Sequence, residues 1–331
     1  MKYFTHPDGI FEIQIPLDWH YKNEVAGYEN KSPFSFELFQ NAQGCFQISC
    51  YHESEQKTNP NLPKSTYNID KLVFVKTELP VTDPELKILL WATVVEDYFF
   101  MAKFVFQSKK INSKIIKKQI EKVENSLATL MCLSPELREL AISFDRFEKF
   151  NASLAASFDL KNRAIKNRSF IELIIINANQ IDAYLRLCIV LKFQIIENTS
   201  LFKLDYLYQG ENDKALIEKT IYNKAMEMNI LSEEQHNKLY TLYGLRNKVV
   251  HRYIITDIKT MELRKINYDY ELLCEDIRSV LTNIETEQFE KKVGYHGTKD
   301  PHREKDQDYV DELFSMVNDK HFSKEFHRKV Q

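Results

Sequence analysis

Hydrophobic and polar residues alternate along the first part of the chain. The alternation is clearest in FEIQI (residues 11–15), FSFEL (34–38) and FQISC (46–50). A period of two predicts β-strands with one buried and one solvated face. The stretch LKILLWATVVEDYFFMAKFVFQ (86–107) predicts an antiparallel hairpin that turns at Glu96 and Asp97 and is more deeply buried than the earlier strands.

A helix is predicted directly after this hairpin. Its apolar residues repeat at spacings of four and three, after a possible N-cap at Asn112 or Ser113, and they are Ile116, Ile120, Val123, Leu127 and Leu130. Strands followed by a covering helix predict an α+β domain over residues 1–133.

From Ser134 onward the hydrophobic period is helical. Ser134 and Pro135 form a helix start signal, and residues 170–197 are apolar almost all round, which predicts a central helix. Ser232 and Gln235 have the capping-box spacing at the start of another helix. The last core helix contains Leu273, Ile277, Val280 and Ile284. Together these segments predict an all-α bundle over residues 134–288.

The apolar helix at 170–197 has one polar stripe. At about 100° per residue, its members fall within an arc of roughly 80°, and they are Glu172, Asn179, Asp182 and Arg186. Two interpretations remain open: the solvated edge of a mostly buried helix, or the wall of a polar site or dimer face, with Asn179 and Asp182 as auxiliary residues.

Residues 289–331 are rich in charge and predict a partly ordered tail with a short helix near Tyr309–Val317. Four histidines of this part of the chain have irregular spacing and no nearby cysteine, so they do not predict a metal site: His296, His302, His321 and His327. We expect neither a metal nor a cofactor.

Composition and charge narrow the possible functions. The chain has 331 residues, 44% of them hydrophobic, and a net charge of −3, which predicts a folded protein in which any RNA contact is local. No secretory signal is recognised at the start, and polar residues interrupt the apolar stretches, so we expect a cytoplasmic protein without a membrane span. The five scattered cysteines predict reduced thiols. Phosphate-loop, dinucleotide-binding and zinc-hydrolase motifs are absent from the sequence.

The stretch GLRNKVVHRY (244–253) combines residue types that suit metal-free RNA cleavage. His251 could move protons to and from the 2′-hydroxyl and the leaving 5′-oxygen, and Arg246 could stabilise charge on phosphorus. Asn247 lies four residues before His251 and shares its helix face. Gly244 would be explained by a closely approaching backbone. The alternative is an ordinary helix end with solvated cations.

Two basic features are candidate RNA contacts. The segment KNRAIKNR (161–168) contains Lys161, Arg163, Lys166 and Arg168 without an acidic residue. Lys248 and Arg252 flank the histidine. A solvated helix face or loop is the competing interpretation for both features.

RNKVVHRY, placed late in an all-α unit, resembles the signature of the HEPN superfamily, and the tyrosine two residues after the histidine matches its HepT-like variant. The resemblance implies a metal-independent endoribonuclease with Arg246 and His251 as the catalytic pair and Asn247 as an orienting residue. It implies that Tyr253 is a position of modification or neutralisation by an antitoxin or regulatory protein. It further implies a homodimer with a toxin-like or phage-defence role.

The first domain, with IPLDW after an early strand, resembles the PsbP-like fold. This resemblance implies a partner-binding or regulatory module. For the whole chain the alternative to a ribonuclease is a non-catalytic dimer that binds RNA or protein through the same helical domain.

Overall fold

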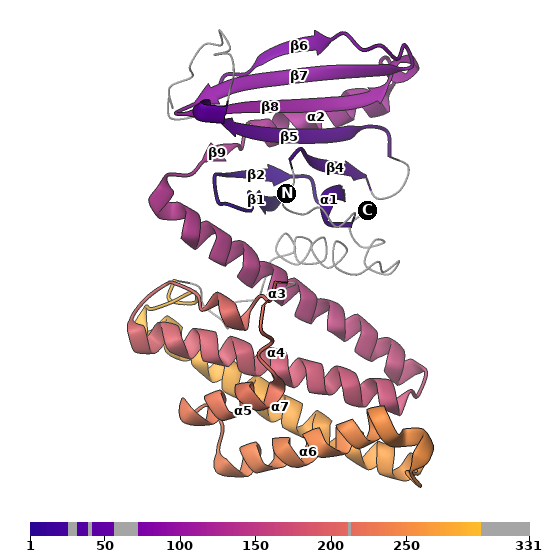
Figure 1. Cartoon of the computed structure of the whole chain (residues 1–331), viewed down its shortest axis with the longest axis vertical. Coiled ribbons are helices and arrows are strands. Elements are labelled where there is room, and N and C mark those ends of the chain that lie inside the picture. Colours follow the sequence, from indigo (N-terminus) through magenta and orange to yellow (C-terminus); the bar gives the residue numbers. More distant parts are fainter. Residues whose placement is uncertain (26–31, 39–41, 56–71, 211–212, 299–331) are drawn as a thin grey trace. The chain divides into compact units, whose positions relative to one another are not determined.

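The computed structural model describes residues 1–25, 32–38, 42–55, 72–210 and 213–298 (Figure 1). Its fold is mixed α+β, with antiparallel sheets in the N-terminal half and helices in the C-terminal half. The described residues divide into two compact units, one from Met1 to Ile142 and one that begins at Ser143. The division falls inside a long helix, α3 (Pro135–Lys166).

The N-terminal unit contains two antiparallel sheets. The smaller has the order β1-β2-β9, with β1 at Lys2–Thr5, β2 at Phe11–Ile15 and β9 at Met131–Cys132. The larger has the order β3-β4-β5-β8-β7-β6. Its strands are β3 (Trp19–Tyr21), β4 (Phe34–Leu38), β5 (Cys45–His52), β6 (Val75–Leu79), β7 (Leu86–Val95) and β8 (Tyr98–Gln107). A four-residue helix, α1 (Lys22–Val25), follows β3.

The predicted hairpin is confirmed, but its expected deep burial is wrong. The β7–β8 register runs from Leu86 opposite Gln107 to Val95 opposite Tyr98. Along β8 buried residues alternate with partly exposed ones. Only one face of this hairpin is therefore in the core, as is usual for antiparallel strands.

Helix α2 (Lys114–Leu127) covers this core with its apolar face. Ser113, one of the two predicted caps, accepts a hydrogen bond from the Ile116 backbone at 3.2 Å. Ile116, Val123 and Leu127 are buried among the phenylalanine rings of the sheets. The Trp19 indole donates to Gln119 Oε1 at 3.0 Å, so its buried N–H is satisfied.

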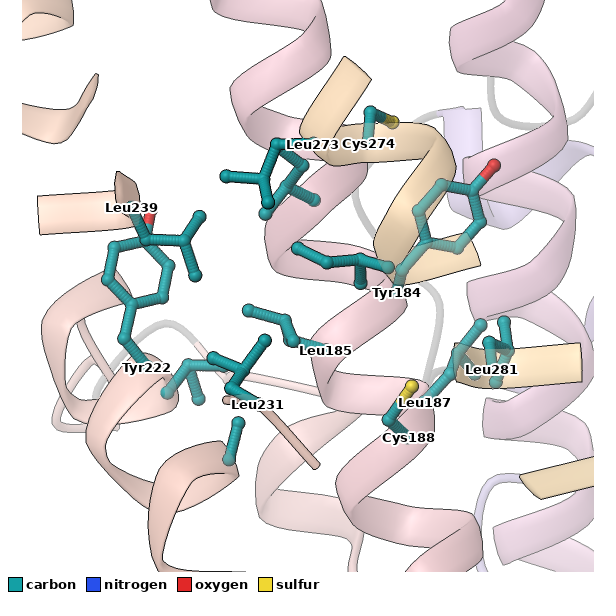
Figure 2. Packing of buried hydrophobic residues seen from close by; sticks show 14 of the residues in the cluster. Tyr184, Leu185, Leu187, Cys188, Tyr222, Leu231, Leu239, Leu273, Cys274 and Leu281 are labelled. Carbon is teal, nitrogen blue, oxygen red and sulfur yellow. The ribbon is translucent and has the colours of Figure 1, made fainter. Parts of the chain in front are cut away.

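The second unit is built around α4 (Phe170–Glu197), the helix predicted to be central. It packs against α5 (Glu218–Glu227), α6 (Glu233–Arg252) and α7 (Thr260–Lys291). Side chains such as Leu185, Cys188, Leu239 and Leu273 interlock between these helices (Figure 2). Although α4 is long and apolar enough to cross a membrane, 72% of its most apolar window is buried within the unit. This burial is typical of the core helix of a soluble protein.

The thiols are reduced and protonated in this fold. Cys45, Cys50, Cys132, Cys188 and Cys274 form no disulfide. Burial raises the pKa of Cys50 to about 12 and that of Cys45 and Cys132 to about 11. None of these three thiols is therefore a ready nucleophile near neutral pH.

Candidate functional site

The motif residues lie on the second half of α6. The capping box at the start of this helix is confirmed: the Gln235 backbone donates to Ser232 Oγ at 3.2 Å, and the Ser232 backbone donates to Gln235 Oε1 at 3.0 Å. Leu239, Leu242 and Val249 are buried against the core. This packing fixes the rotation of α6 and therefore the direction in which each motif residue points.

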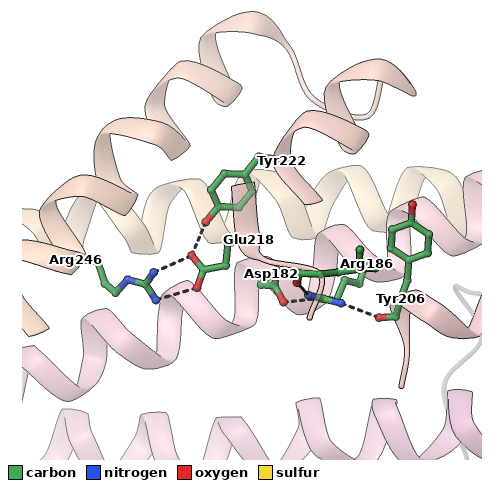
Figure 3. Close-up of polar contacts among 7 residues, drawn as sticks. Asp182, Arg186, Tyr206, Glu218, Tyr222 and Arg246 are labelled. Atoms are coloured by element: carbon green, nitrogen blue, oxygen red, sulfur yellow. Dashed lines mark hydrogen bonds and ion pairs between the residues drawn. The ribbon is translucent and has the colours of Figure 1, made fainter. Parts of the chain in front are cut away.

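Arg246 makes a two-pronged ion pair with Glu218, the first residue of α5. Its Nη1 donates to Glu218 Oε1 at 2.8 Å and its Nη2 donates to Oε2 at 3.1 Å (Figure 3). The Tyr222 hydroxyl also donates to Oε2, at 3.1 Å. The Arg246 side chain is 16% exposed and that of Glu218 is 18% exposed. Such a bidentate pair holds both side chains in one geometry.

A second arginine anchors the segment that leads into α5. Arg186 Nε donates to Asp182 Oδ2 at 2.6 Å. One terminal nitrogen donates to the carbonyl oxygen of Tyr206 at 3.3 Å (Figure 3). The other donates to the carbonyl oxygen of Leu216 at 2.7 Å. Arg186 thus ties α4 to the chain immediately before Glu218.

The predicted polar stripe on α4 has two parts. Glu172 and Asn179 are exposed, as expected for a solvated edge. Asp182 and Arg186 are only partly exposed and bind each other. We call Asp182, Arg186, Glu218, Tyr222, Arg246 and the nearby Tyr270 the polar cluster. Asp182 belongs to it, whereas Asn179 does not.

Burial shapes the electrostatics of this cluster. It raises the pKa of Asp182, an effect that the neighbouring Arg186 opposes and the Glu218 charge reinforces. It also raises the pKa of Tyr222 and Tyr270, so both phenols are neutral near pH 7. Among the described residues, three buried atoms of the cluster have no hydrogen-bond partner: Asp182 Oδ1, Arg246 Nε and Tyr270 Oη.

His251 lies on a different face of α6 from Arg246. It lies five residues after Arg246 on α6, a separation of about 140° around the helix axis. His251 is exposed, and Asn247, one turn earlier, is partly exposed. Arg246, held by Glu218, and His251 therefore do not share one face of α6, whereas Asn247 and His251 share a face as predicted.

The structure also describes the surroundings of Tyr253 and Gly244. Tyr253 follows α6 and is exposed. The explanation offered for Gly244 is wrong: apart from its chain neighbours and its own helix backbone, no atom of the described residues lies within 4 Å of the position that a Cβ would occupy there. A side chain would fit at this position.

Only some of the basic side chains at the end of α3 could contact RNA. Lys161 lies 3.7 Å from Glu271, and Arg163 lies 2.7 Å from Asp159. Lys166 and Arg168 are exposed at the end of the helix, as are Lys248 and Arg252 on α6. Arg163 is also exposed but is bonded to Asp159, so Lys166, Arg168, Lys248 and Arg252 are the stronger candidates for contacts with a phosphate backbone.

Exposed apolar residues lie close to His251 in the sequence. We name them the α6-end patch, which consists of Val250, Ile254, Ile255 and Met261. Ile254 is 94% exposed and Ile255 is 79% exposed. Adjacent exposed aliphatic residues of this kind are typical of interaction surfaces.

The sequence interpretation missed Glu218, Tyr222 and Tyr270. Helix α5 has only ten residues, and its N-cap residue, Ile217, makes no side-chain capping bond. The only sequence signal was an acidic residue at the start of a short helical stretch.

No metal centre is formed by the histidines, cysteines and carboxylates of the described ranges. His296 lies 3.6 Å from Glu285. His302, His321, His327 and the predicted helix at Tyr309–Val317 lie outside the residues that the structure describes.

Comparisons with known proteins identify no family. No family model matches the chain, and no curated protein matches it. A crystal structure of a protein from Bacteroides thetaiotaomicron VPI-5482 aligns with 15% identity and a TM-score of 0.29, covering 75% of this chain and 79% of that chain.

Proposed function

We propose that the helical unit is a HEPN-type domain that acts as a homodimer and cleaves RNA without a metal. The observation that carries the proposal is the exposure of His251 at the end of α6, one turn after Asn247 and close in the sequence to the α6-end patch. An imidazole must be accessible to exchange protons with RNA, and His251 is accessible.

In the proposed reaction the 2′-hydroxyl of RNA attacks the adjacent phosphorus. One imidazole accepts the proton of the hydroxyl, and the leaving 5′-oxygen takes up a proton as its bond to phosphorus breaks. The products are a 2′,3′-cyclic phosphate and a 5′-hydroxyl end. Two protomers supply two histidines to one cleft, so one can act as the base and the other as the acid.

Cations for the phosphates are present around His251. Lys248 and Arg252 are exposed on the same part of α6 and are suited to bind the RNA backbone. Arg246 is the proposed cation for the charge on phosphorus, because its planar fork fits two phosphate oxygens. In this role Arg246 would have to exchange Glu218 for RNA.

The N-terminal unit is proposed to be a PsbP-like module that binds a partner or regulates the nuclease. We place the protein in the cytoplasm, in a toxin-like or phage-defence role, with Tyr253 accessible to an antitoxin or modifying enzyme. RNA, a second copy of the chain and a regulatory protein are thus the proposed partners.

A non-catalytic dimer that binds RNA or protein is the second candidate. The ion pair between Arg246 and Glu218 favours it, because this arginine already has a protein partner on both terminal nitrogens. Under this alternative Arg246 stabilises the contact between α5 and α6 and never contacts RNA.

The test is an RNA cleavage assay in buffer that contains a chelator. Wild-type protein should produce 2′,3′-cyclic phosphate ends, and His251→Ala and Arg246→Ala should each reduce the rate by at least about a hundredfold. His236→Ala is the control, since His236 lies on the same helix but bonds to Asn223 at 3.0 Å. RNA binding without new ends, or equal rates in all variants, would favour the non-catalytic dimer.

A further inference from the structure

Glu218 binds the terminal guanidinium nitrogens of Arg246, which are the atoms that an RNA phosphate would bind. Both terminal nitrogens of the guanidinium donate to its carboxylate, at 2.8 and 3.1 Å. Arginine uses the same fork to bind two oxygens of a phosphate. The two terminal nitrogens cannot hold the carboxylate and a phosphate in this way at once. RNA must therefore compete with Glu218.

The charges around Arg246 favour Glu218 over an RNA phosphate in this competition. In the cluster, the two arginines, Arg186 and Arg246, are balanced by the two carboxylates, Asp182 and Glu218. A phosphate that entered beside Glu218 would add uncompensated negative charge at short range, which is costly at a partly buried site. Removal of the Glu218 charge would reverse this balance and leave Arg246 attractive to anions.

The position of Glu218 allows it to be displaced. It is the first residue of a ten-residue helix whose N-cap makes no side-chain hydrogen bond. First turns of this kind open more easily than helix interiors. Three groups favour the closed position: Arg246, the Tyr222 hydroxyl at 3.1 Å, and Arg186 through the Leu216 carbonyl at 2.7 Å.

We infer that Glu218 is an autoinhibitory latch on Arg246, and that the phosphate backbone of RNA displaces it when the site is engaged. This inference rests on the proposed function, because it assigns Arg246 a phosphate to bind. In the resting protein the latch keeps Arg246 neutralised. Arg186 and Tyr222 are positioning residues that hold the latch closed.

The experiment measures binding and cleavage of a short labelled single-stranded RNA of mixed sequence in chelator. Glu218→Gln keeps the shape of the side chain and removes its charge, so RNA should bind on the order of tenfold more tightly and be cleaved faster. Adding Arg246→Ala to Glu218→Gln should abolish the gain. Glu287→Gln is the matched control, because Glu287 bonds to Lys192 at 2.9 Å and Lys291 at 2.6 Å in the same unit.

Thermal melting shows which variants are folded. If Glu218→Gln does not fold, Glu218→Asp replaces it: the shorter carboxylate should weaken the pair and give a smaller gain in RNA binding. A folded Glu218 variant that binds RNA no more tightly than wild type overturns the latch. An equal gain in RNA affinity from Glu287→Gln also overturns the latch, because the gain would then come from the lower net negative charge of the protein and not from Arg246.

The latch and the nuclease can fail separately. If His251→Ala abolishes cleavage while the Glu218 variants change nothing, the latch is wrong and the nuclease stands. If Glu218→Gln tightens RNA binding and no variant makes cyclic phosphate ends, the latch is supported as a control of binding and the nuclease proposal is wrong. Failure of every variant to bind RNA overturns both.

Discussion

Two arginines on different helices are bound to the same short stretch of chain. Arg186 of α4 donates to the carbonyl of Leu216, and Arg246 of α6 donates to the carboxylate of Glu218. Each arginine is largely buried, and burial of an unpaired charge is costly. At the start of α5, Glu218 neutralises Arg246 of α6, whereas the charge of Arg186 is neutralised by Asp182 on α4 itself.

At the residue scale, loss of Arg246 should destabilise the helical unit. Arg246→Met should lower the free energy of unfolding by about 3 kcal/mol, because Glu218 would remain largely buried without its partner. Arg278→Met removes a pair with Glu275 in which both side chains are 53% exposed, and it should cost less than about 1 kcal/mol. Urea unfolding of both variants measures the difference. Equal losses would contradict a structural contribution from the Arg246 pair.

His6 should make the N-terminal unit sensitive to acid. Burial lowers its pKa from 6.5 to about 4, so the unfolded chain binds the proton more tightly than the folded chain. The resulting stabilisation is fully present above pH 6.5 and is lost as the pH falls through about 4. The full effect is roughly 3 kcal/mol.

His6→Gln tests this prediction, because an amide oxygen can still accept the hydrogen bond that the Asp8 backbone gives to His6 Nδ1 at 3.0 Å. Between neutral pH and pH 4, wild type should lose more unfolding free energy than the variant in urea titrations. Identical pH profiles would show that His6 does not couple protonation to folding.

At the scale of elements, strong sequence patterns were sufficient to locate helices and strands, and weak patterns were not. The apolar run of α4 and the capping box of α6 located both helices from sequence. The short strands β3 and β6 gave no comparable period and were missed, although β2 and β4, of five residues each, were predicted from their alternation. Helix α5 was also missed, and with it Glu218, which lies 28 residues before its partner Arg246. Side-chain pairing across a loop depends on packing, which local patterns do not contain.

The exposed end of α3 should contribute to RNA binding. Lys166 and Arg168 are exposed, whereas Lys161 and Arg163 lie beside carboxylates. Reversal of the two exposed charges, Lys166→Glu with Arg168→Glu, should weaken RNA binding and lower the slope of log affinity against log salt by about 1 to 2. Lys117→Glu with Lys118→Glu on α2 is the control. An unchanged slope would exclude this helix end from the RNA contact.

At the scale of the whole molecule, the α6-end patch should be the centre of a dimer interface. Ile254→Asp with Ile255→Asp would place two charges where a partner is expected, so the mass in light scattering should fall from that of a dimer to that of a monomer. Ile196→Asp, at an exposed residue near the end of α4, is the control and should leave the mass unchanged. A monomeric wild type, or a dimer that survives the double substitution, would place the interface elsewhere.

The mixed α+β architecture followed from the sequence because the change from a period of two to a helical period is a property of long segments. The arrangement of the motif could not be predicted in the same way. Spacing on α6 correctly grouped Asn247 with His251, but only packing showed that Arg246 turns toward α5. The proposed site therefore depends on a second protomer and on the release of Arg246.

The most direct test of the account is sequencing of the RNA ends formed when the chain is expressed in growing cells. Wild type should arrest growth and produce RNA fragments with 2′,3′-cyclic phosphate ends, and His251→Ala should do neither at equal protein level. Fragments of the same kind and number from His251→Ala, or arrest without any such ends from wild type, would contradict the claim that His251 cleaves RNA.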